Sequence, residues 1–305
     1  MLVGAQIAVG AAAIFARLGL SGAPPLAVSA WRLVIASAVL LAIAGLTPRL
    51  RSRPLADARG RSIPHDDKRR ARVVLIAAGV ALAVHFGSWI WSLEYTSVAV
   101  STLLVATVPI WTAIYDSVVL KRHLSSIGYA AFLAGAAGLT LVVGFNRARA
   151  PIAGHEYLGD ALAVVGAIAI GAYFLLVREV RHDFGTRSIV TRTYSWGALV
   201  LLIGSLAAHQ YPPAITDQKA WGGILAMALI SQLLGHTGMN ASLRWFTPSA
   251  VAMTTLLEPV IAAVLALMLF GETLTPPAVV GGVLVLLAIG AFLREEQRLS
   301  GAADG

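Results

Sequence analysis

The sequence predicts an all-α polytopic membrane protein, with ten transmembrane helices arranged as two inverted five-helix repeats. Three observations lead to this prediction: an apolar composition, ten long apolar segments, and a weak similarity between the two halves of the chain. Of the 305 residues, 58% are hydrophobic and 12% are charged, about half the charged share of a soluble domain. The abundance of Leu, Val and Ile excludes a disordered chain. The absence of cysteine excludes disulfides and thiolate chemistry.

Ten apolar segments are long enough to cross a membrane as helices. A helix needs about 20 residues to span the hydrocarbon core of a bilayer. The segments are residues 2–19, 26–46, 73–92, 98–119, 125–145, 158–177, 188–208, 221–241, 249–270 and 276–293. Turn-forming residues such as Pro24, Pro151, Pro213 and Pro248 separate them. Because the apolar runs are continuous rather than alternating, they favour helices over the strands of a membrane β-barrel.

The basic residues predict the orientation of these helices. With the N-terminus in the cytoplasm, the inside segments carry 17 Lys and Arg residues and the outside segments carry three. Nine of the 17 lie in the loop 47–72, which is expected to be a cytoplasmic linker, with an anionic-lipid patch as the alternative. This asymmetry predicts that both termini are cytoplasmic. It also explains the net charge of +8 without a nucleic-acid partner.

The two halves of the chain resemble each other at an offset of about 150 residues. His85 then aligns with His236, and after a slip of one residue Pro109 aligns with Pro259. Five helices is an odd number, so the second repeat would enter the membrane upside down. Inverted repeats are typical of secondary transporters, whose substrate site lies near the membrane midplane. The predicted units are residues 1–145, residues 158–293 and a cytoplasmic tail of residues 294–305.

Several motifs resemble those of EamA-type carriers of the drug/metabolite transporter superfamily. They are Ser92 to Ala99 followed by Pro109, Leu257-Glu258-Pro259-Val260 followed by Leu269-Phe270-Gly271-Glu272, Gly235-His236-Thr237 with Asn240, and Trp31-Arg32-Leu33. The resemblance covers nearly the whole chain. It implies ten helices in two repeats, a bacterial-type inner (cell) membrane, and transport, often export, of amino acids, metabolites or drugs. The first repeat departs from the family at Lys121-Arg122, where Gly-Glu is common.

Glu258 is the deepest acidic residue and lies about midway along the ninth apolar segment. An ionisable residue at membrane depth is costly unless it is paired or hydrated, so its position suggests a function. One hypothesis is that Glu258 lines the substrate cavity and binds a proton or an amine. The alternative is structural: Glu258 stays protonated or pairs with an arginine beside the kink expected at Pro259.

Two polar stripes are predicted to face each other inside the bundle. Gln232, His236 and Asn240 share one face of the eighth helix at intervals of four residues. His85 and Trp89 lie on the related face of the third helix, with His85 equivalent to His236. We expect these stripes to line the substrate path, with Trp89 packing on substrate. The alternative is that they form interhelical hydrogen bonds that fix packing.

Three further residues have two interpretations each, and a fourth is expected to be structural. Arg17 and Arg32 could bind a substrate carboxylate through the planar guanidinium group. For Arg32, snorkelling to the outer interface or pairing with Glu258 is favoured, whereas Arg17 stays a candidate path residue. Tyr173 is a candidate cavity residue, with an interfacial position as the alternative. Asp116 is expected to be structural and neutralised by Lys121 and Arg122.

These features favour a secondary transporter that moves an amino acid or related amphipathic metabolite by alternating access, and the family resemblance implies export. Drug or hydrophobic-solute efflux is the alternative, and a membrane-embedded enzyme is less favoured. The chain has no GxxxxGK[ST], HExxH or GxSxG motif, so neither ATP-driven transport nor these catalytic types is expected. No metal or cofactor is expected. The expected partners are a small-molecule substrate and the lipid bilayer, with protons as candidate coupling ions; homodimerisation is left open.

Overall fold

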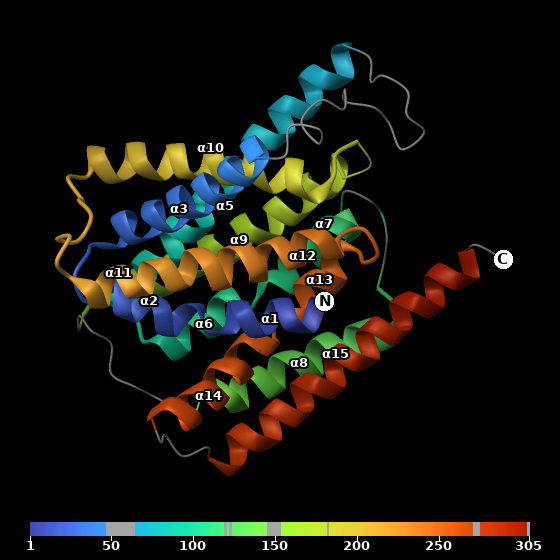
Figure 1. The fold of residues 1–305 in the computed structure, drawn as a ribbon. Coiled ribbons are helices and arrows are strands. Elements are labelled where there is room, and N and C mark those ends of the chain that lie inside the picture. Colours follow the sequence, from blue (N-terminus) through green and yellow to red (C-terminus); the bar gives the residue numbers. More distant parts are fainter. Residues whose placement is uncertain are drawn as a thin grey trace.

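The computed structural model describes residues 1–46, 65–118, 121, 124–144, 154–181, 183–270 and 275–303. Every regular element in this part of the chain is a helix. Figure 1 shows the helices packed into one bundle. They are α1 (Leu2–Gly10), α2 (Ala12–Leu20), α3 (Pro25–Leu46), α5 (His65–Tyr95), α6 (Val98–Val105), α7 (Val108–Val118), α8 (Ser126–Gly144), α9 (Glu156–Glu179), α10 (Thr186–Ala207), α11 (Gln218–Ala226), η1 (Met227–His236), α12 (Thr237–Ser242), α13 (Pro248–Thr254), α14 (Leu257–Phe270) and α15 (Pro276–Ala303).

The lengths and compositions of these helices confirm a polytopic all-α membrane protein. Within the described ranges, nine helical stretches are long and apolar enough to cross a membrane, and Ser126–Val142 is a shorter apolar helix. Together they match the ten segments expected from hydropathy. Many of the side chains on the outside of the bundle are large and apolar, as a lipid-facing surface requires.

Three of the membrane-spanning stretches are broken near their middle. The first divides at Ala11 into α1 and α2. The fourth and ninth are interrupted at residues 106–107 and 255–256, each about one turn before a proline, Pro109 or Pro259. Proline has no backbone N–H and its ring crowds the preceding turn, so it accounts for both interruptions.

The eighth membrane-spanning stretch changes its winding near the centre of the bundle. It starts as α11, continues as the π-helix η1 and ends as α12. A π-helix has a wider turn than an α-helix and often occurs at functional sites. Here it carries the buried side chains of Gln232 and His236.

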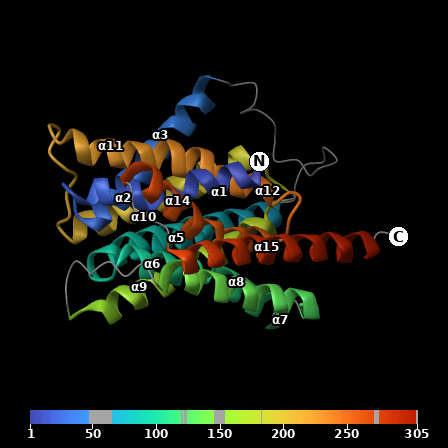
Figure 2. The same cartoon turned by 90° about the horizontal axis from the view of Figure 1, so that it is seen from below.

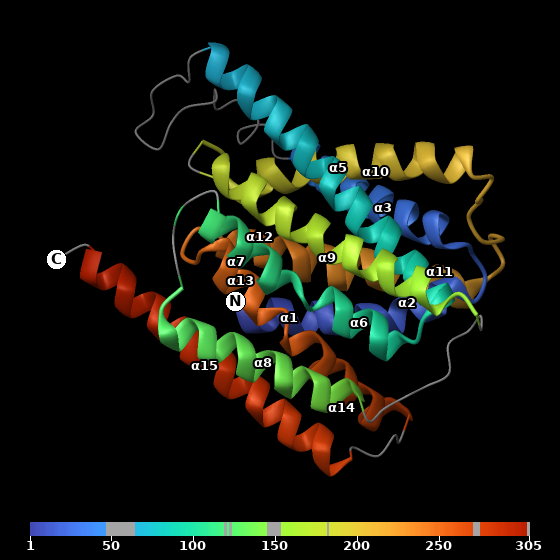
Figure 3. The same cartoon turned by 180° about the vertical axis from the view of Figure 1, so that it is seen from behind.

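The helices pack in pairs that join the two halves of the chain. In the larger core, α5 lies along α9, α2 and α1 lie along α11 and η1, and α3 lies along α10. A smaller core forms where α8 and α15 lie side by side at one edge of the bundle, as Figures 1 and 3 show. Gly138 and Gly281 allow these two helices to approach closely, because a Cβ on Gly138 would lie 2.7 Å from the Gly281 carbonyl oxygen.

Two helices extend beyond the apolar segments predicted from hydropathy. The third helix begins at His65, so residues 65–72 of the expected loop 47–72 are helical, while residues 47–64 lie outside the described part. The last helix continues to Ala303, so most of the expected tail 294–305 extends α15. Figure 2 shows this C-terminal end projecting beyond the neighbouring helices. In both cases the extension is charged, and hydropathy identifies only the apolar part of a helix.

Candidate functional site

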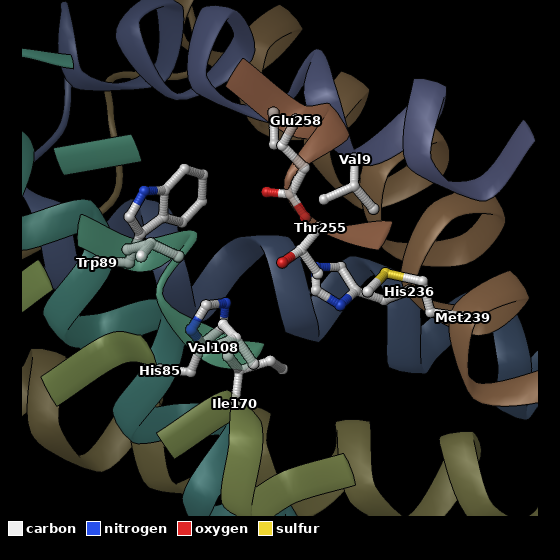
Figure 4. Close-up of a pocket in the computed structure, with 11 residues that line it drawn as sticks. Val9, His85, Trp89, Val108, Ile170, His236, Met239, Thr255 and Glu258 are labelled. Atoms are coloured by element: carbon white, nitrogen blue, oxygen red, sulfur yellow. The ribbon is translucent and has the colours of Figure 1, made fainter. Parts of the chain in front are cut away.

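A small cavity lies between α1, α5, α7, α9, η1 and α14. Most of its wall is apolar and includes Val9, Val108 and Ile170. Its polar side chains belong to residues far apart in the sequence, and Figure 4 shows them projecting toward one space. The cavity measures about 30 Å³. That volume accommodates about two water molecules, so a metabolite would require movement of the surrounding side chains.

His85 on α5 and His236 at the end of η1 face each other across the bundle. The centroids of their rings are 6.2 Å apart, and both side chains are buried. His85 Nδ1 lies 2.9 Å from the carbonyl oxygen of Gly166 on α9, which fixes the orientation of that ring. The indole of Trp89 is stacked on His85 with a centroid distance of 6.2 Å. The structure therefore brings together the two predicted polar stripes.

Glu258 reaches the same cavity from the first turn of α14. Its backbone N–H donates to the Thr255 carbonyl oxygen at 2.9 Å, so the chain turns sharply just before the carboxylate-bearing residue. This turn is part of the interruption that precedes Pro259, and it directs the Glu258 side chain inward, as Figure 4 shows. The break in the ninth helix thus positions an acidic group at the cavity.

Arg32 lies behind the wall of the cavity and is completely buried. Its Nε donates to Gln232 Oε1 at 2.9 Å, and its guanidinium carbon lies 3.8 Å from the centre of the Phe86 ring. The Phe86 ring in turn contacts His236, with 5.0 Å between centroids. The two terminal nitrogens of Arg32 have no hydrogen-bond partner among the described residues.

Of the two structural roles favoured for Arg32, snorkelling to the outer interface is therefore wrong, which leaves the role of a partner for Glu258. Helix α3 is surrounded by α5, α10 and η1, and Arg32 lies on a face directed into the bundle. The sequence indicates the depth of a residue along a helix but not the direction in which its face points. Arg32 is near enough to Glu258 for their opposite charges to interact, but no direct ion pair joins them in the described structure.

Gln232, Asn240 and Tyr173 are buried beside the cavity without lining it. The Tyr173 hydroxyl donates to Asn240 Oδ1 at 2.9 Å, and Asn240 Nδ2 donates to the His236 carbonyl oxygen at 2.8 Å. These bonds tie α9 to the end of η1 and hold His236 in place. Their geometry corresponds to the packing role that was the alternative for this stripe.

Arg17 and Asp116 lie away from the cavity. Arg17 is exposed on α2 and does not join the polar cluster. Lys121 is exposed, and Arg122, the other residue expected to neutralise Asp116, lies outside the described residues. Asp116 on α7 accepts a hydrogen bond of 2.5 Å from the Ser249 hydroxyl on α13. Asp116 thus connects the fourth and ninth membrane-spanning stretches, as a structural residue would.

Gln6 is a buried polar residue that the sequence interpretation overlooked. Its side chain is fully buried on α1, and its Nε2 donates to the Thr254 hydroxyl at 2.7 Å. The bond joins α1 to the end of α13, directly before the break that precedes Glu258. A glutamine inside an otherwise apolar segment was the available signal, because such a residue is costly in lipid.

The sequence is similar to those of known proteins over most of its length. The sequence model of the EamA-like transporter family matches residues 1–144 and 157–294. A Bacillus subtilis protein named "Uncharacterized transporter YyaM" is 25% identical over 95% of the chain and 91% of its own length. A "Probable terminal-alkyne amino-acid exporter" of Streptantibioticus cattleyicolor is 22% identical over 90% of the chain and 85% of its own length.

A solved crystal structure has the same fold. It superimposes with a TM-score of 0.75 at 15% sequence identity, and the alignment covers 98% of this chain and 96% of the other. At that identity the likeness establishes the arrangement of the helices and not the substrate.

Proposed function

The chain belongs to the EamA-like transporter family, and on this premise we propose that it exports an amino acid or a related zwitterionic metabolite by alternating access. It does so as a secondary transporter in the cell (inner) membrane, without catalysing a chemical reaction. The named exporter among its relatives supports the direction and the substrate class. The 17-to-3 distribution of basic residues supports cytoplasmic positions for both termini.

The observation that carries the proposal is the separation of two opposite charges around one cavity. Glu258 lines the cavity, and Arg32 lies behind Phe86 and His236. Two nitrogens of Arg32 have no partner among the residues that the structure describes. A zwitterion presents a carboxylate, which suits the planar guanidinium, and an ammonium group, which suits Glu258. Opening of the cavity at Phe86 would let both ends of such a solute reach their partners, while Trp89 packs on its side chain.

Alternating access follows from the proposed division into two inverted repeats, residues 1–145 and 158–293. Two features support it: the family model matches once in each half, and Pro109 and Pro259 break equivalent helices. The packing supports it too, because the most extensive contacts between a helix of the first half and a helix of the second have equivalent contacts between their counterparts. The pair formed by α5 and α9 corresponds to the pair formed by the eighth and first membrane-spanning stretches. Two repeats that can exchange conformations supply an inward-open and an outward-open state.

A gradient of substrate or of protons would drive the transport. Glu258, His85 and His236 are the candidate proton-binding groups because they are the ionisable side chains at the cavity. Proton coupling would require one of them to bind a proton in only one of the two states.

Efflux of a hydrophobic drug-like solute is the second candidate function. It is favoured by the apolar wall of the cavity, which includes Val9, Val108, Ile170 and Met239. A hydrophobic cation would need Glu258 but not Arg32, so the two functions predict different responses to replacement of the arginine.

The test measures exchange of labelled amino acids in proteoliposomes containing wild-type protein, Glu258→Gln or His236→Ala. We expect both variants to lose at least about tenfold in exchange rate, since each removes a polar group from the only route proposed for the substrate. Glu179→Gln is the matched control, because that glutamate is exposed and paired with Arg70 at the surface. Wild-type exchange in Glu258→Gln and His236→Ala, at equal amounts of inserted protein, would reject the proposed site.

A further inference from the structure

A second hollow lies at the end of the bundle that carries the connection between α12 and α13. It measures about 440 Å³, within the range of small-molecule sites. Its walls come from the end of α9, from residues 243–247 and from α15. With both termini in the cytoplasm, this end of the bundle is cytoplasmic. The hollow is therefore separate from the cavity of Glu258 and His236, and no residue lines both.

Three arginines line this hollow, against one carboxylate. Arg178, Arg181 and Arg244 contribute positive charge, and Glu296 is the acidic residue in its wall. One oxygen of Glu296 already accepts a hydrogen bond of 3.1 Å from the backbone N–H of Thr247. The lining thus carries a surplus of positive charge. Like charges gathered around a concave surface raise the positive electrostatic potential inside it.

Arg181 is the unusual member of this cluster because it is buried. Only 8% of its surface is exposed. Its Nη2 donates to the Thr186 hydroxyl at 2.5 Å, but its Nε and Nη1 have no hydrogen-bond partner among the described residues. Burial, together with the like charge of Arg244, lowers the pKa of Arg181 to about 10. An arginine that only set the orientation of the protein in the membrane could remain exposed to water. That role therefore does not explain why Arg181 is buried.

We propose that this hollow binds a phosphate-bearing anion, held by Arg181 with Arg178 and Arg244. A phosphate group offers several acceptor oxygens to the free edge of a guanidinium and neutralises neighbouring positive charges. It would supply the partners that the Nε and Nη1 atoms of Arg181 lack, and it would relieve the repulsion between the arginines. The phosphate can come from a soluble phosphate compound or from an anionic lipid headgroup of the cytoplasmic leaflet.

The first experiment uses the purified full chain in detergent and inorganic phosphate as the probe. Its thermal stability is followed as phosphate is added, with potassium chloride at the same ionic strength as the reference, because exposed charges respond to salt alone. We expect phosphate to raise the melting temperature more than chloride does. We expect Arg181→Gln to weaken the apparent affinity at least about tenfold, since it removes a charge-assisted hydrogen-bond donor.

Two further variants keep this test decisive. Arg244→Gln changes an exposed side chain, so it is expected to fold even if Arg181→Gln does not, and to weaken phosphate binding by a smaller factor. Arg298→Gln removes the same charge from an exposed arginine of α15 that does not line the hollow, and it should behave as wild type.

The second experiment separates the two sources of phosphate. The chain is placed in nanodiscs of phosphatidylcholine with or without phosphatidic acid, and retention of the acidic lipid is measured by native mass spectrometry. Binding of free phosphate identifies a soluble ligand, and Arg181- or Arg244-dependent binding of phosphatidic acid alone identifies a lipid headgroup. Equal responses of wild type, Arg181→Gln and Arg244→Gln to both probes, or a chloride effect equal to that of phosphate, would overturn the proposal.

Discussion

Arg32 illustrates how a charged side chain can be kept inside an apolar bundle. Its Nε is paired with Gln232 and its guanidinium lies on the face of Phe86, but both terminal nitrogens lack a hydrogen-bond partner in the described part of the chain. A buried charge with an incomplete set of partners destabilises the folded protein. A carboxylate that fills the free positions would compensate for this during binding, and that is the role proposed for Arg32. Arg17 lies on the surface of α2.

Replacement of Arg32 by lysine tests whether binding of a substrate carboxylate requires the planar guanidinium group or only a positive charge. Lysine keeps the positive charge but cannot form two parallel hydrogen bonds to a carboxylate or stack on Phe86 in the same way. We therefore expect Arg32→Lys to reduce amino-acid exchange in proteoliposomes by at least about tenfold, from a loss of roughly 1.4 kcal/mol or more of binding.

Arg17→Lys is the control for this prediction, because it makes the same exchange on an exposed arginine of the same repeat. It should retain exchange close to that of wild type. The opposite pattern, with Arg17→Lys impaired and Arg32→Lys active, would move the carboxylate site to α2.

At the scale of the helices, the close contact of α8 with α15 is held by two glycines. A Cβ added to Gly281 would collide with the backbone carbonyl of Gly138, which cannot move without shifting the helix. Helices in lipid associate mainly through such close packing, since lipid removes the hydrophobic drive between them. The pair formed by α8 and α15 should therefore be sensitive to one methyl group.

Gly281→Ala is expected to destabilise the protein by about 1–3 kcal/mol, the usual cost of overpacking. Gly290 lies on the same helix, and a Cβ built on it would have no atom of another described helix within 4 Å. Gly290→Ala should thus be neutral or slightly stabilising. Thermal unfolding in detergent measures both, and equal melting temperatures for the two variants would show that α8 and α15 are not packed as described.

The positions of the helices, a kink at Pro259 and the inward direction of the polar stripes could be predicted from sequence, but the complete interruption of three membrane-spanning stretches and the inward direction of Arg32 could not. Apolar runs set the existence and approximate length of each membrane-spanning stretch. The breaks before Pro109 and Pro259 depend on whether neighbouring helices stabilise a kinked backbone, which is a property of the packed bundle. The sequence identifies Glu258, His85 and His236 as buried polar groups. For Arg32 it leaves two positions open, the interface or a pairing with Glu258, and Gln6 is overlooked.

At the scale of the whole molecule, the proposed orientation explains where the basic residues lie. The connections after α2 and α10 lie at the end of the bundle opposite to the C-terminus in Figure 1. In the proposed orientation these connections are outside the cell, where few basic residues occur. The cytoplasmic end then contains the hollow lined by Arg178, Arg181 and Arg244.

Because the chain contains no cysteine, single cysteines can report this orientation without further changes. Ile215→Cys, at a position that is 92% exposed between α10 and α11, should react with a membrane-impermeant maleimide in intact cells. Arg298→Cys, on the exposed end of α15, should react only after the cells are opened. The reverse pattern of labelling would place both termini outside.

Counterflow in proteoliposomes tests the central claim most directly. Vesicles containing the purified wild-type chain are loaded with a pool of unlabelled amino acids, and the entry of each labelled amino acid is followed. The proposed function predicts transient accumulation of at least one zwitterionic amino acid, and its loss in vesicles that contain Arg32→Lys or Glu258→Gln. Absence of exchange for every amino acid, in protein shown to be folded and inserted, would contradict the claim that this chain carries amino acids.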